Sequence, residues 1–423
     1  MTLTPEPSGG DKAPSVPLRE AARRVAKRLR EAGFEAYFAG GCVRDGLLGL
    51  EPDDYDIATS ARPEEVLRVF PKARGVGEAF GVMLVRGDRH IFEVATFRTD
   101  VEYVDGRRPS SVRFATSRED AERRDFTING LFEDPETGAI VDFVDGQADL
   151  ERRVLRAIGD PALRFAEDHL RLLRAVRFAA RYHLAIDART AQSMRECGPK
   201  LALIARERIG LELRRMLEHP TRAVAAGLLE EYRLDGVVLG EGPMHASAGR
   251  LGQLPPEARF ELALLAWGLD RQGSGVAADL APGQLARWRN ALVLSNGEEA
   301  LIADMARCRR GLPGFFGERE SRRKRLAARP GFADACRLHA IDDPRAAAGV
   351  EEWRSRTDPA TIAPLPLVTG DDLIGLGLAP GPRFRDLLER TYDAQLEGAV
   401  RTPEEAIELV RRLGSEGAGG ASG

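Results

Sequence analysis

Two aspartates separated by one residue, Asp54 and Asp56, are the strongest sign of chemistry in this sequence of 423 residues. Side chains two positions apart on a strand point to the same face, so the spacing predicts neighbouring carboxylates. Such carboxylates repel one another unless cations neutralise them, and Mg²⁺ is commonly held by one or two carboxylates together with substrate phosphates. Next to the Gly-Gly turn at residues 40 and 41, the pair indicates a two-metal site for nucleotidyl transfer. A solvated acidic turn, which Asp53 would extend, is the alternative.

A third acidic residue, Glu93, lies in the run HIFEVATFR, where polar and apolar residues alternate. The alternation places its side chain on the face opposite to Phe92 and Val94. A third carboxylate on a neighbouring strand favours catalysis over an acidic turn. We therefore predict Asp54, Asp56 and Glu93 as catalytic residues, with the two aspartates as ligands of Mg²⁺.

Two consecutive glycines, Gly40 and Gly41, follow a strand-like run, Glu35–Ala39, and precede a helical run, Cys42–Leu48. Glycines at such a junction let backbone N–H groups approach a phosphate, and the helix start adds partial positive charge. A Gly-Gly pair alone is more typical of a simple tight turn. Neither the GxGxxG nor the GxxxxGK[ST] fingerprint is present, so the known dinucleotide-binding and P-loop patterns are not matched.

Adjacent arginines, Arg123 and Arg124, precede Asp125, and Asn129 follows in the run RRDFTING. Guanidinium groups donate in a bidentate manner to phosphate, so the run suits contacts with a triphosphate and a ribose. A surface cluster of ion pairs is the alternative.

A row of charged residues, Asp168, Arg171, Arg174 and Arg177, recurs at intervals of three within the helical run Asp160–Tyr182. On a continuous helix these side chains would be neighbours. An ordinary ion pair between the first arginine and the glutamate four residues before it, beside a solvent-facing arginine stripe, is the default interpretation of this segment alone.

The elements that must position these residues change in kind along the chain. The first part alternates amphipathic helices with short strand-like runs, whereas the strand signal fades beyond Leu150. The expected strands are Glu35–Ala39, Tyr55–Thr59, Val82–Val85, His90–Phe97 and Val112–Ala115, and the expected helices are Leu18–Glu31, Cys42–Leu48, Pro63–Phe70, Asp160–Tyr182, Ala188–Glu196, Arg206–His219 and Arg222–Glu230. The pattern predicts an α/β (α+β) head, followed by an all-α body and tail.

The composition of the chain indicates its domain organisation and its cellular compartment. Residues 1–15 and 414–423 are rich in Gly, Ser and Pro or Ala and are expected to be disordered; between them we expect a head (16–150), a helical neck (151–230) and a helical body and tail (231–413). No apolar run reaches the roughly 18 residues that a membrane span needs. Four dispersed cysteines without a CxxC pair argue against a disulfide framework or a cysteine-based zinc site, and they favour a reducing cytoplasm.

The net charge of the chain does not indicate a nucleic-acid partner. The formal net charge is −4, from 62 Lys and Arg against 66 Asp and Glu. Of those 62 cations, 57 are arginine, whose planar donors suit phosphate. Genomic base composition explains most of this excess, so the positions of the arginines must decide which of them matter.

Together these motifs resemble the class II nucleotidyltransferase superfamily of CCA-adding tRNA nucleotidyltransferases and bacterial poly(A) polymerases. Five blocks occur in the order of that family, which is far more specific than any one of them. They are GGCVRDGLLGLEPDDYDIAT, RRDFTINGLFEDP, GDPALRFAEDHLRLLRAVRFAARY, ERIGLELRRML and, near residues 367–409, the run from LVTGDDLIGLGL to RTPEEAIEL.

The resemblance implies a fold, an activity and a set of site residues. It implies a nucleotidyltransferase head with a mixed sheet that includes antiparallel strands, addition of CCA to the 3′ end of tRNA from CTP and ATP with release of pyrophosphate, and two Mg²⁺ ions. It also implies a tRNA-binding helical body and a flexible loop at Phe97–Phe114, for which a β-hairpin turning at Asp105-Gly106 is the alternative. By resemblance, the nucleotide-binding residues are Gly41, Arg44, Arg124, Asp168, Arg171, Arg174 and Arg177.

The chemistry of the bases supports the Asp168–Arg171 pair independently. Cytosine and adenine both present an exocyclic amino donor beside a ring-nitrogen acceptor, which a carboxylate and a guanidinium can satisfy. Uracil and guanine present a carbonyl beside a ring N–H, so both contacts would fail, at about 1–3 kcal/mol for each unpaired group. Such a pair selects C and A without a nucleic-acid template. An A-adding enzyme, a poly(A) polymerase and an inactive RNA-binding relic of the fold are the alternatives, and the oligomeric state is left open.

Overall fold

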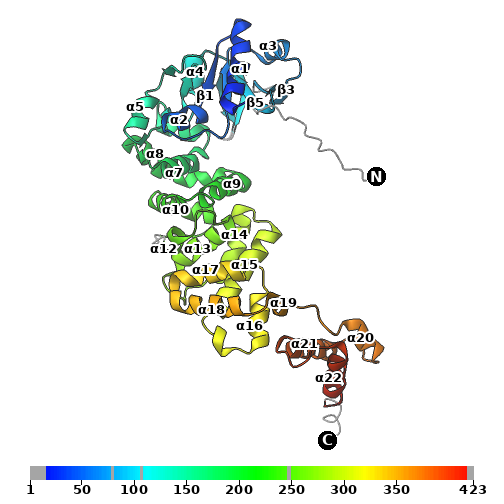
Figure 1. The fold of residues 1–423 in the computed structure, drawn as a ribbon. Coiled ribbons are helices and arrows are strands. Elements are labelled where there is room, and N and C mark those ends of the chain that lie inside the picture. The colour runs from blue at the N-terminus through cyan, green and yellow to red at the C-terminus, as the bar shows by residue number, and fades with distance from the viewer. Residues whose placement is uncertain (1–15, 78–80, 105–107, 245–248, 417–423) are drawn as a thin grey trace, which may run out of the picture. The chain divides into compact units, whose positions relative to one another are not determined.

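The computed structural model describes residues 16–77, 81–104, 108–244 and 249–416 (Figure 1). These residues form two compact units, each described here by itself. The first contains the described residues up to Glu212 together with Glu231–Val237, and the second contains Leu213–Glu230 together with the described residues from Val238 onward. Segment 1–15 lies outside the described residues, as does the C-terminal segment beyond Glu416.

The first unit is built around a mixed sheet of seven strands, in the order β3-β4-β5-β2-β1-β8-β9. Strands β2 and β5 are parallel, and the other neighbouring pairs are antiparallel. The strands are β1 (Ala36–Ala39), β2 (Asp56–Thr59), β3 (Arg74–Gly77), β4 (Val82–Gly87), β5 (His90–Thr96), β8 (Leu131–Glu133) and β9 (Ile140–Asp142). The predicted mixed sheet is therefore confirmed, although the short strands β3, β8 and β9 were not among the predicted strands.

Helix α1 (Leu18–Glu31) has the predicted bounds and packs against the sheet (Figure 1). Its alanines 21, 22 and 26, with Val25 and Leu29, are fully or almost fully buried, as its helical periodicity requires. The other helices of the head are α2 (Gly41–Leu47), α3 (Pro63–Val69), α4 (Ser117–Glu122) and α5 (Gly146–Glu151), with a 3₁₀ turn at Thr127–Asn129.

Strands β6 (Arg98–Val104) and β7 (Arg108–Phe114) pair as an antiparallel hairpin. The hairpin alternative for Phe97–Phe114 is thus the one that the structure adopts for these strands. The turn predicted at Asp105-Gly106 lies outside the described residues. At the hairpin base, the backbone N–H of Arg98 donates to the Asp120 carboxylate at 3.3 Å.

The strand register brings the distant acidic and glycine motifs together. Ala39 pairs with Asp56 across β1 and β2, so Asp56 lies beside the turn at Gly40. In the parallel pair β2–β5, Ile57 lies opposite Val94, and the preceding position in each strand is Asp56 or Glu93. Side chains at matched positions share a face, so Glu93 lies beside Asp56 as predicted.

The predicted helix Asp160–Tyr182 is wrong, because the chain breaks into α6 (Pro161–Glu167) and α7 (Arg171–Tyr182). Asp168 has extended backbone angles, φ −150° and ψ 106°. Its Oδ1 accepts the backbone N–H of Leu170 at 3.0 Å, a local bond that competes with helical hydrogen bonding. Asp168 therefore does not share a helical row with Arg171, and the apolar periodicity on both sides hid the break.

The remaining elements are helical except for a short parallel pair, β10 (Val154–Leu155) and β11 (Ala185–Ile186). They are α8 (Ala188–Cys197), α9 (Arg206–Leu217), α10 (Arg222–Glu231), α11 (Asp235–Leu239), α12 (Gly249–Gln253), α13 (Phe260–Gln272), α14 (Gln284–Leu292), α15 (Asn296–Gly311), α16 (Glu320–Ala327), α17 (Phe332–Asp342), α18 (Pro344–Arg356), α19 (Pro359–Ile362), α20 (Gly370–Gly375), α21 (Pro382–Leu396) and α22 (Pro403–Glu416), with 3₁₀ turns at Gly198–Leu203 and Phe315–Gly317. The predicted all-α body and tail is confirmed. Within the described ranges, no helix combines the length and the apolarity that a bilayer crossing demands.

Candidate nucleotide site

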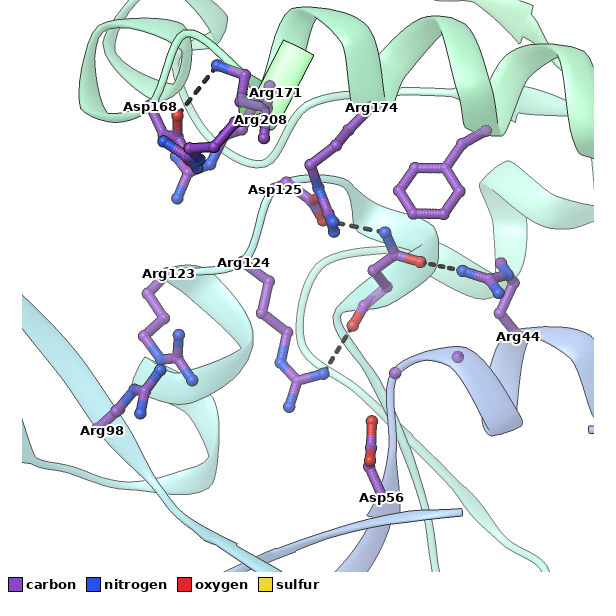
Figure 2. A pocket seen from close by; sticks show the side chains of 15 residues that line it. Arg44, Asp56, Arg98, Arg123, Arg124, Asp125, Asp168, Arg171, Arg174 and Arg208 are labelled. Atoms are coloured by element: carbon purple, nitrogen blue, oxygen red, sulfur yellow. Dashed lines mark hydrogen bonds and ion pairs between the residues drawn. The ribbon is translucent and has the colours of Figure 1, made fainter. Parts of the chain in front are cut away.

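A cavity of about 630 Å³ opens in the first unit, and it collects most of the predicted site residues. Figure 2 shows Asp56 at one end of the view and Asp168 with Arg171 at the other, with arginines between them. The lining residues are Gly40, Gly41, Arg44, Asp56, Arg98, Arg123, Arg124, Asp125, Asn129, Asp168, Leu170, Arg171, Arg174, Phe178 and Arg208. Seven of these are arginines and three are aspartates, so the lining carries an excess of four positive charges.

Asp56 supplies the carboxylate at one end of the cavity. Burial, followed by the charges of Asp54 and Glu93, raises the pKa of Asp56 to about 6 against the opposing effect of Arg124. Asp54 and Glu93 therefore lie close enough to Asp56 to affect its ionisation. Asp54 and Glu93 are not among the residues that line the cavity, and Asp54 precedes β2 rather than lying on it.

The donor set fits a divalent cation that shares its coordination with a substrate. Carboxylate oxygens are the ligands that Mg²⁺ prefers, and the mutual repulsion that raises the pKa of Asp56 is relieved by a cation. Across the described part of the chain, no three His, Cys, Asp or Glu side chains converge as a complete metal cage. Any ion here must therefore take further ligands from phosphate or water.

The Gly40–Gly41 turn forms the neighbouring wall. Gly40 has φ +70°, a region that only glycine enters without strain, and its N–H donates to the carbonyl of Leu131 at 3.1 Å. A Cβ at Gly40 would lie 3.0 Å from Nη1 of Arg124. The glycine therefore allows the arginine to lie close to the turn.

Gly40→Ala is expected to lower kcat/KM for nucleotide incorporation by about 10-fold, because the added Cβ strains the turn and displaces Arg124. Steady-state kinetics checks this, with Gly46→Ala as the matched control. Gly46 lies in α2, and a Cβ there meets nothing within 4 Å. Equal activity in the two variants would contradict the importance of the turn.

Asp125 is the buried centre of the middle wall. Its carboxylate accepts from Arg174 Nε at 2.7 Å, from Asn129 Nδ2 at 3.0 Å and from the backbone N–H of Phe126 at 2.9 Å. Burial alone would raise the pKa of Asp125, but the charge of Arg174 and the hydrogen bond from Asn129 outweigh it and lower the pKa from 3.8 to about 2. The pair fixes Arg174 at the cavity wall.

Asp125→Asn is expected to destabilise the first unit at pH 7 by about 2 kcal/mol or more, because it leaves Arg174 without its buried counter-charge. The folded-state pKa of Asp125 is depressed, so its stabilising effect is complete above about pH 4 and is lost as the pH falls through about 2. The deficit of the variant should therefore shrink over that range.

Hydrogen exchange of peptides from the first unit measures this deficit at neutral pH. The three tryptophans, at 267, 288 and 353, all lie in the second unit, so their fluorescence during urea unfolding serves as the internal control. Unchanged exchange in the segment 125–182 of the variant would contradict a stabilising role for the pair.

Arg44 was predicted to bind nucleotide, and the structure places it in the cavity wall with several protein partners. Its guanidinium donates to Asn129 Oδ1 and to the Tyr182 hydroxyl, both at 2.6 Å, and to Asp45 Oδ1 at 2.9 Å. Only 6% of Arg44 is exposed. The contacts join α2 to the RRDFTIN segment and to α7, so Arg44 braces the wall.

Asp120 is a functional neighbour that the sequence prediction missed. Its buried carboxylate accepts from Arg123 Nη2 at 2.7 Å and from Arg124 Nη2 at 2.9 Å, and their charges lower its pKa although burial opposes this. Its position three and four residues before the two arginines on a short helix was the available signal. One carboxylate therefore orients both arginines, and Arg124 also donates to the carbonyl of Asn129 at 3.0 Å.

At the other end of the cavity, Asp168 and Arg171 each have a fixed orientation. Asp168 Oδ2 accepts from Arg208 Nη2 at 2.7 Å, while Arg171 donates to Glu167 and to the carbonyl of Arg164. Arg208, on α9, was missed because nothing in the sequence links it to a residue 40 positions earlier. The third arginine of the predicted row, Arg177, pairs instead with Glu212 at 2.7 Å and is not a lining residue.

Comparison with known proteins identifies the family. Residues 36–156 match the family described as "Poly A polymerase head domain", and residues 183–256 match "Probable RNA and SrmB- binding site of polymerase A". The CCA-adding enzyme of Geobacillus thermodenitrificans is 38% identical over 341 residues, which cover 74% of this chain and 84% of that protein. The chain belongs to the family of CCA-adding enzymes. The predicted family resemblance is thereby confirmed.

Other members of this family agree. The CCA-adding enzyme of Streptococcus mutans is 42% identical over 245 residues, 57% of this chain and 61% of that protein. A crystal structure of the Bacillus stearothermophilus CCA-adding enzyme in complex with CTP matches with a TM-score of 0.76 and 28% identity, covering 96% of this chain and all of that one. The Thermotoga maritima CCA-adding enzyme complexed with tRNA_CCA shares the fold, with a TM-score of 0.63 and 20% identity over 93% of this chain and 94% of that one.

Proposed function

We propose that this CCA-adding enzyme family member adds C, C and A to the 3′ end of tRNA without a nucleic-acid template, using CTP and ATP and releasing pyrophosphate. The observation that carries the proposal is that Asp56 and the Asp168–Arg171 pair lie in one cavity whose lining has four excess positive charges. A nucleoside triphosphate has the complementary parts, since its base carries donors and acceptors and its phosphates carry the negative charge. The named relatives and the CTP and tRNA complexes of related structures support the same substrates.

Base selection is assigned to Asp168 and Arg171. The carboxylate accepts from the exocyclic amino group of cytosine or adenine, and the guanidinium donates to the adjacent ring nitrogen. Because Arg208 and Leu170 hold the carboxylate and Glu167 holds the guanidinium, the pair is oriented before the nucleotide arrives. Such preorganisation lowers the ordering cost of binding.

The triphosphate is assigned to the arginines between the two ends. Arg124 and Arg174 are oriented by Asp120 and Asp125 respectively, so neither needs to be ordered when the phosphates bind. Gly41 lies at the start of α2, where its backbone is accessible to a phosphate. Arg177, which pairs with Glu212, would act on the phosphates or ribose only through its neighbours or after that pair breaks.

Two Mg²⁺ ions are proposed as the cofactor, held by Asp54 and Asp56, with Glu93 as a third carboxylate. When bound, such ions lower the pKa of a coordinated RNA 3′-hydroxyl and neutralise the triphosphate. The chain itself contributes orientation of the reacting groups and a preorganised field of guanidinium charges. The four cysteines are all free thiols, in keeping with the proposed cytoplasmic location.

Catalysis, base recognition and tRNA binding are proposed to belong to different parts of the chain. The head, 16–150, supplies the carboxylates and phosphate contacts, and the neck, 151–230, supplies the base-recognition pair. The helical body and tail, 231–413, would bind tRNA, for which the match of residues 183–256 to an RNA-binding family segment is partial support.

A primer-extension experiment tests the function. The protein is incubated with tRNA ending before CCA, after C or after CC, and with an unstructured RNA, each with CTP, ATP or both. Three ordered additions on tRNA are the expected result. Addition of A only after CC would assign an A-adding enzyme, and long A tails on the unstructured RNA would assign a poly(A) polymerase.

A further inference from the structure

We propose that Arg164, which lies outside the nucleotide cavity, is a positioning residue for base selection. The inference rests on the proposed function, because it names what holds the base-recognition pair in place. Arg164 lies on α6, one helical turn before the break at Asp168. It is not among the predicted site residues, and it lines a cavity other than the nucleotide cavity.

The contacts of Arg164 join three segments of the first unit. Its Nη1 donates to Glu167 Oε2 at 3.0 Å and to the carbonyl of Arg123 at 3.2 Å, and its Nε donates to the carbonyl of Ile158 at 3.1 Å. The planar guanidinium can satisfy these three acceptors at once, which the single ammonium of a lysine cannot do from one position. Arg164 therefore fixes the start of α6 against the segment that carries Arg123.

Glu167 connects this brace to the nucleotide cavity. The same oxygen, Oε2, accepts from both Arg164 and Arg171. Arg171 also donates to the backbone carbonyl of Arg164 at 2.9 Å. Two of the groups that orient the base-recognising guanidinium are therefore the backbone of Arg164 and a carboxylate that the Arg164 side chain holds.

Arg164 acts through other residues and not by contact with the nucleotide. It lines a separate cavity of about 660 Å³, together with residues such as Arg156 and Arg189, and none of its contacts is to Asp56 or Asp168. Loss of the Arg164 side chain would leave Glu167 paired with Arg171 but not with Arg164. It would also remove the hydrogen bond to the carbonyl of Arg123, whose side chain lines the nucleotide cavity. Arg171 and Arg123 would then shift relative to each other, while the carboxylates at the other end stay in place.

The test compares Arg164→Gln with wild type and with Arg189→Gln in the full-length protein. Arg189 is an exposed arginine of the same cavity, so its variant removes the same charge without touching Glu167. Single-nucleotide addition to tRNA lacking CCA is measured with CTP and with UTP. We expect Arg164→Gln to raise KM for CTP about 10-fold with a smaller change in kcat, and to lower the CTP-to-UTP ratio of kcat/KM about 10-fold.

Two further measurements separate positioning from folding. Arg164→Lys should give an intermediate CTP-to-UTP ratio, and Arg164→Ala should recover part of the ratio when methylguanidinium is added, because the side chain faces a cavity large enough to admit it. A folded Arg164→Gln protein with a wild-type ratio would overturn the proposal, as would an equal effect of Arg189→Gln. If wild type itself fails to extend tRNA, the proposed function is at fault instead.

Discussion

Asp56→Asn is expected to reduce nucleotide incorporation into tRNA by about 1,000-fold or more while tRNA affinity changes little. The substitution keeps the size of the side chain but removes the negative charge at the carboxylate end of the cavity. Asp56 is the only one of the three predicted catalytic carboxylates among the described lining residues, and burial together with Asp54 and Glu93 already raises its pKa to about 6. Loss of this charge should therefore abolish cation binding at the reaction centre and leave remote RNA contacts intact.

The matched control is Asp53→Asn, which removes an exposed negative charge three residues earlier. Single-turnover incorporation and filter binding of tRNA are measured on both variants and wild type. Glu93→Gln, measured alongside, tests whether the neighbouring carboxylate contributes. Normal turnover in Asp56→Asn would contradict the assignment of Asp56 as a metal ligand. An equal loss of activity in Asp53→Asn would show that the effect comes from the loss of any nearby negative charge.

Asp168→Asn is expected to lower kcat/KM for CTP by about 10- to 100-fold and to narrow the preference for CTP over UTP by a similar factor. The carboxylate accepts from Arg208 and from the backbone of Leu170 and is proposed to accept also from the base amino group. An amide offers one oxygen and one NH₂, so one of these acceptor roles is lost. The NH₂ can instead donate to the carbonyl of uracil.

The control for this prediction is Glu207→Gln, which removes an exposed negative charge next to Arg208 on α9. Competition between CTP and UTP on tRNA lacking CCA gives the ratio directly. A wild-type ratio in Asp168→Asn would show that base selection lies elsewhere in the cavity. A lower kcat/KM for CTP without a higher kcat/KM for UTP would show that Asp168 contributes to nucleotide binding but does not discriminate against uracil.

The location of charge matters more for this protein than its total. The whole chain has a formal charge of −4, whereas the cavity lining has seven arginines and three aspartates. Three of the seven are held by buried carboxylates, Arg123 and Arg124 by Asp120 and Arg174 by Asp125. The acidic residues near the site thus fix the arginines in place, and each of them offsets one of the positive charges.

Local sequence determined the parts whose signals are short-range. The bounds of α1 follow from its apolar periodicity, and the start of α3 follows from Pro63. The aspartate and glycine motifs were visible for the same reason, because each lies within a few residues of the strand end that presents it. The division into an α/β head and a helical body was likewise predictable from the fading strand alternation.

Tertiary structure decided which charged residues far apart in the chain meet. The break at Asp168 is stabilised in part by Arg208, 40 residues away, so helical periodicity could not reveal it. The pairing of Arg177 with Glu212 and the bracing of Arg44 by Tyr182 depend in the same way on contacts between distant segments. The sequence of an arginine-rich segment does not show whether its side chains contact a nucleotide or a carboxylate of the protein. Packing of the elements fixes the distant partners of Arg174, Arg177 and Arg208, because an ion pair depends on a separation of a few ångströms in space, whatever the separation along the chain.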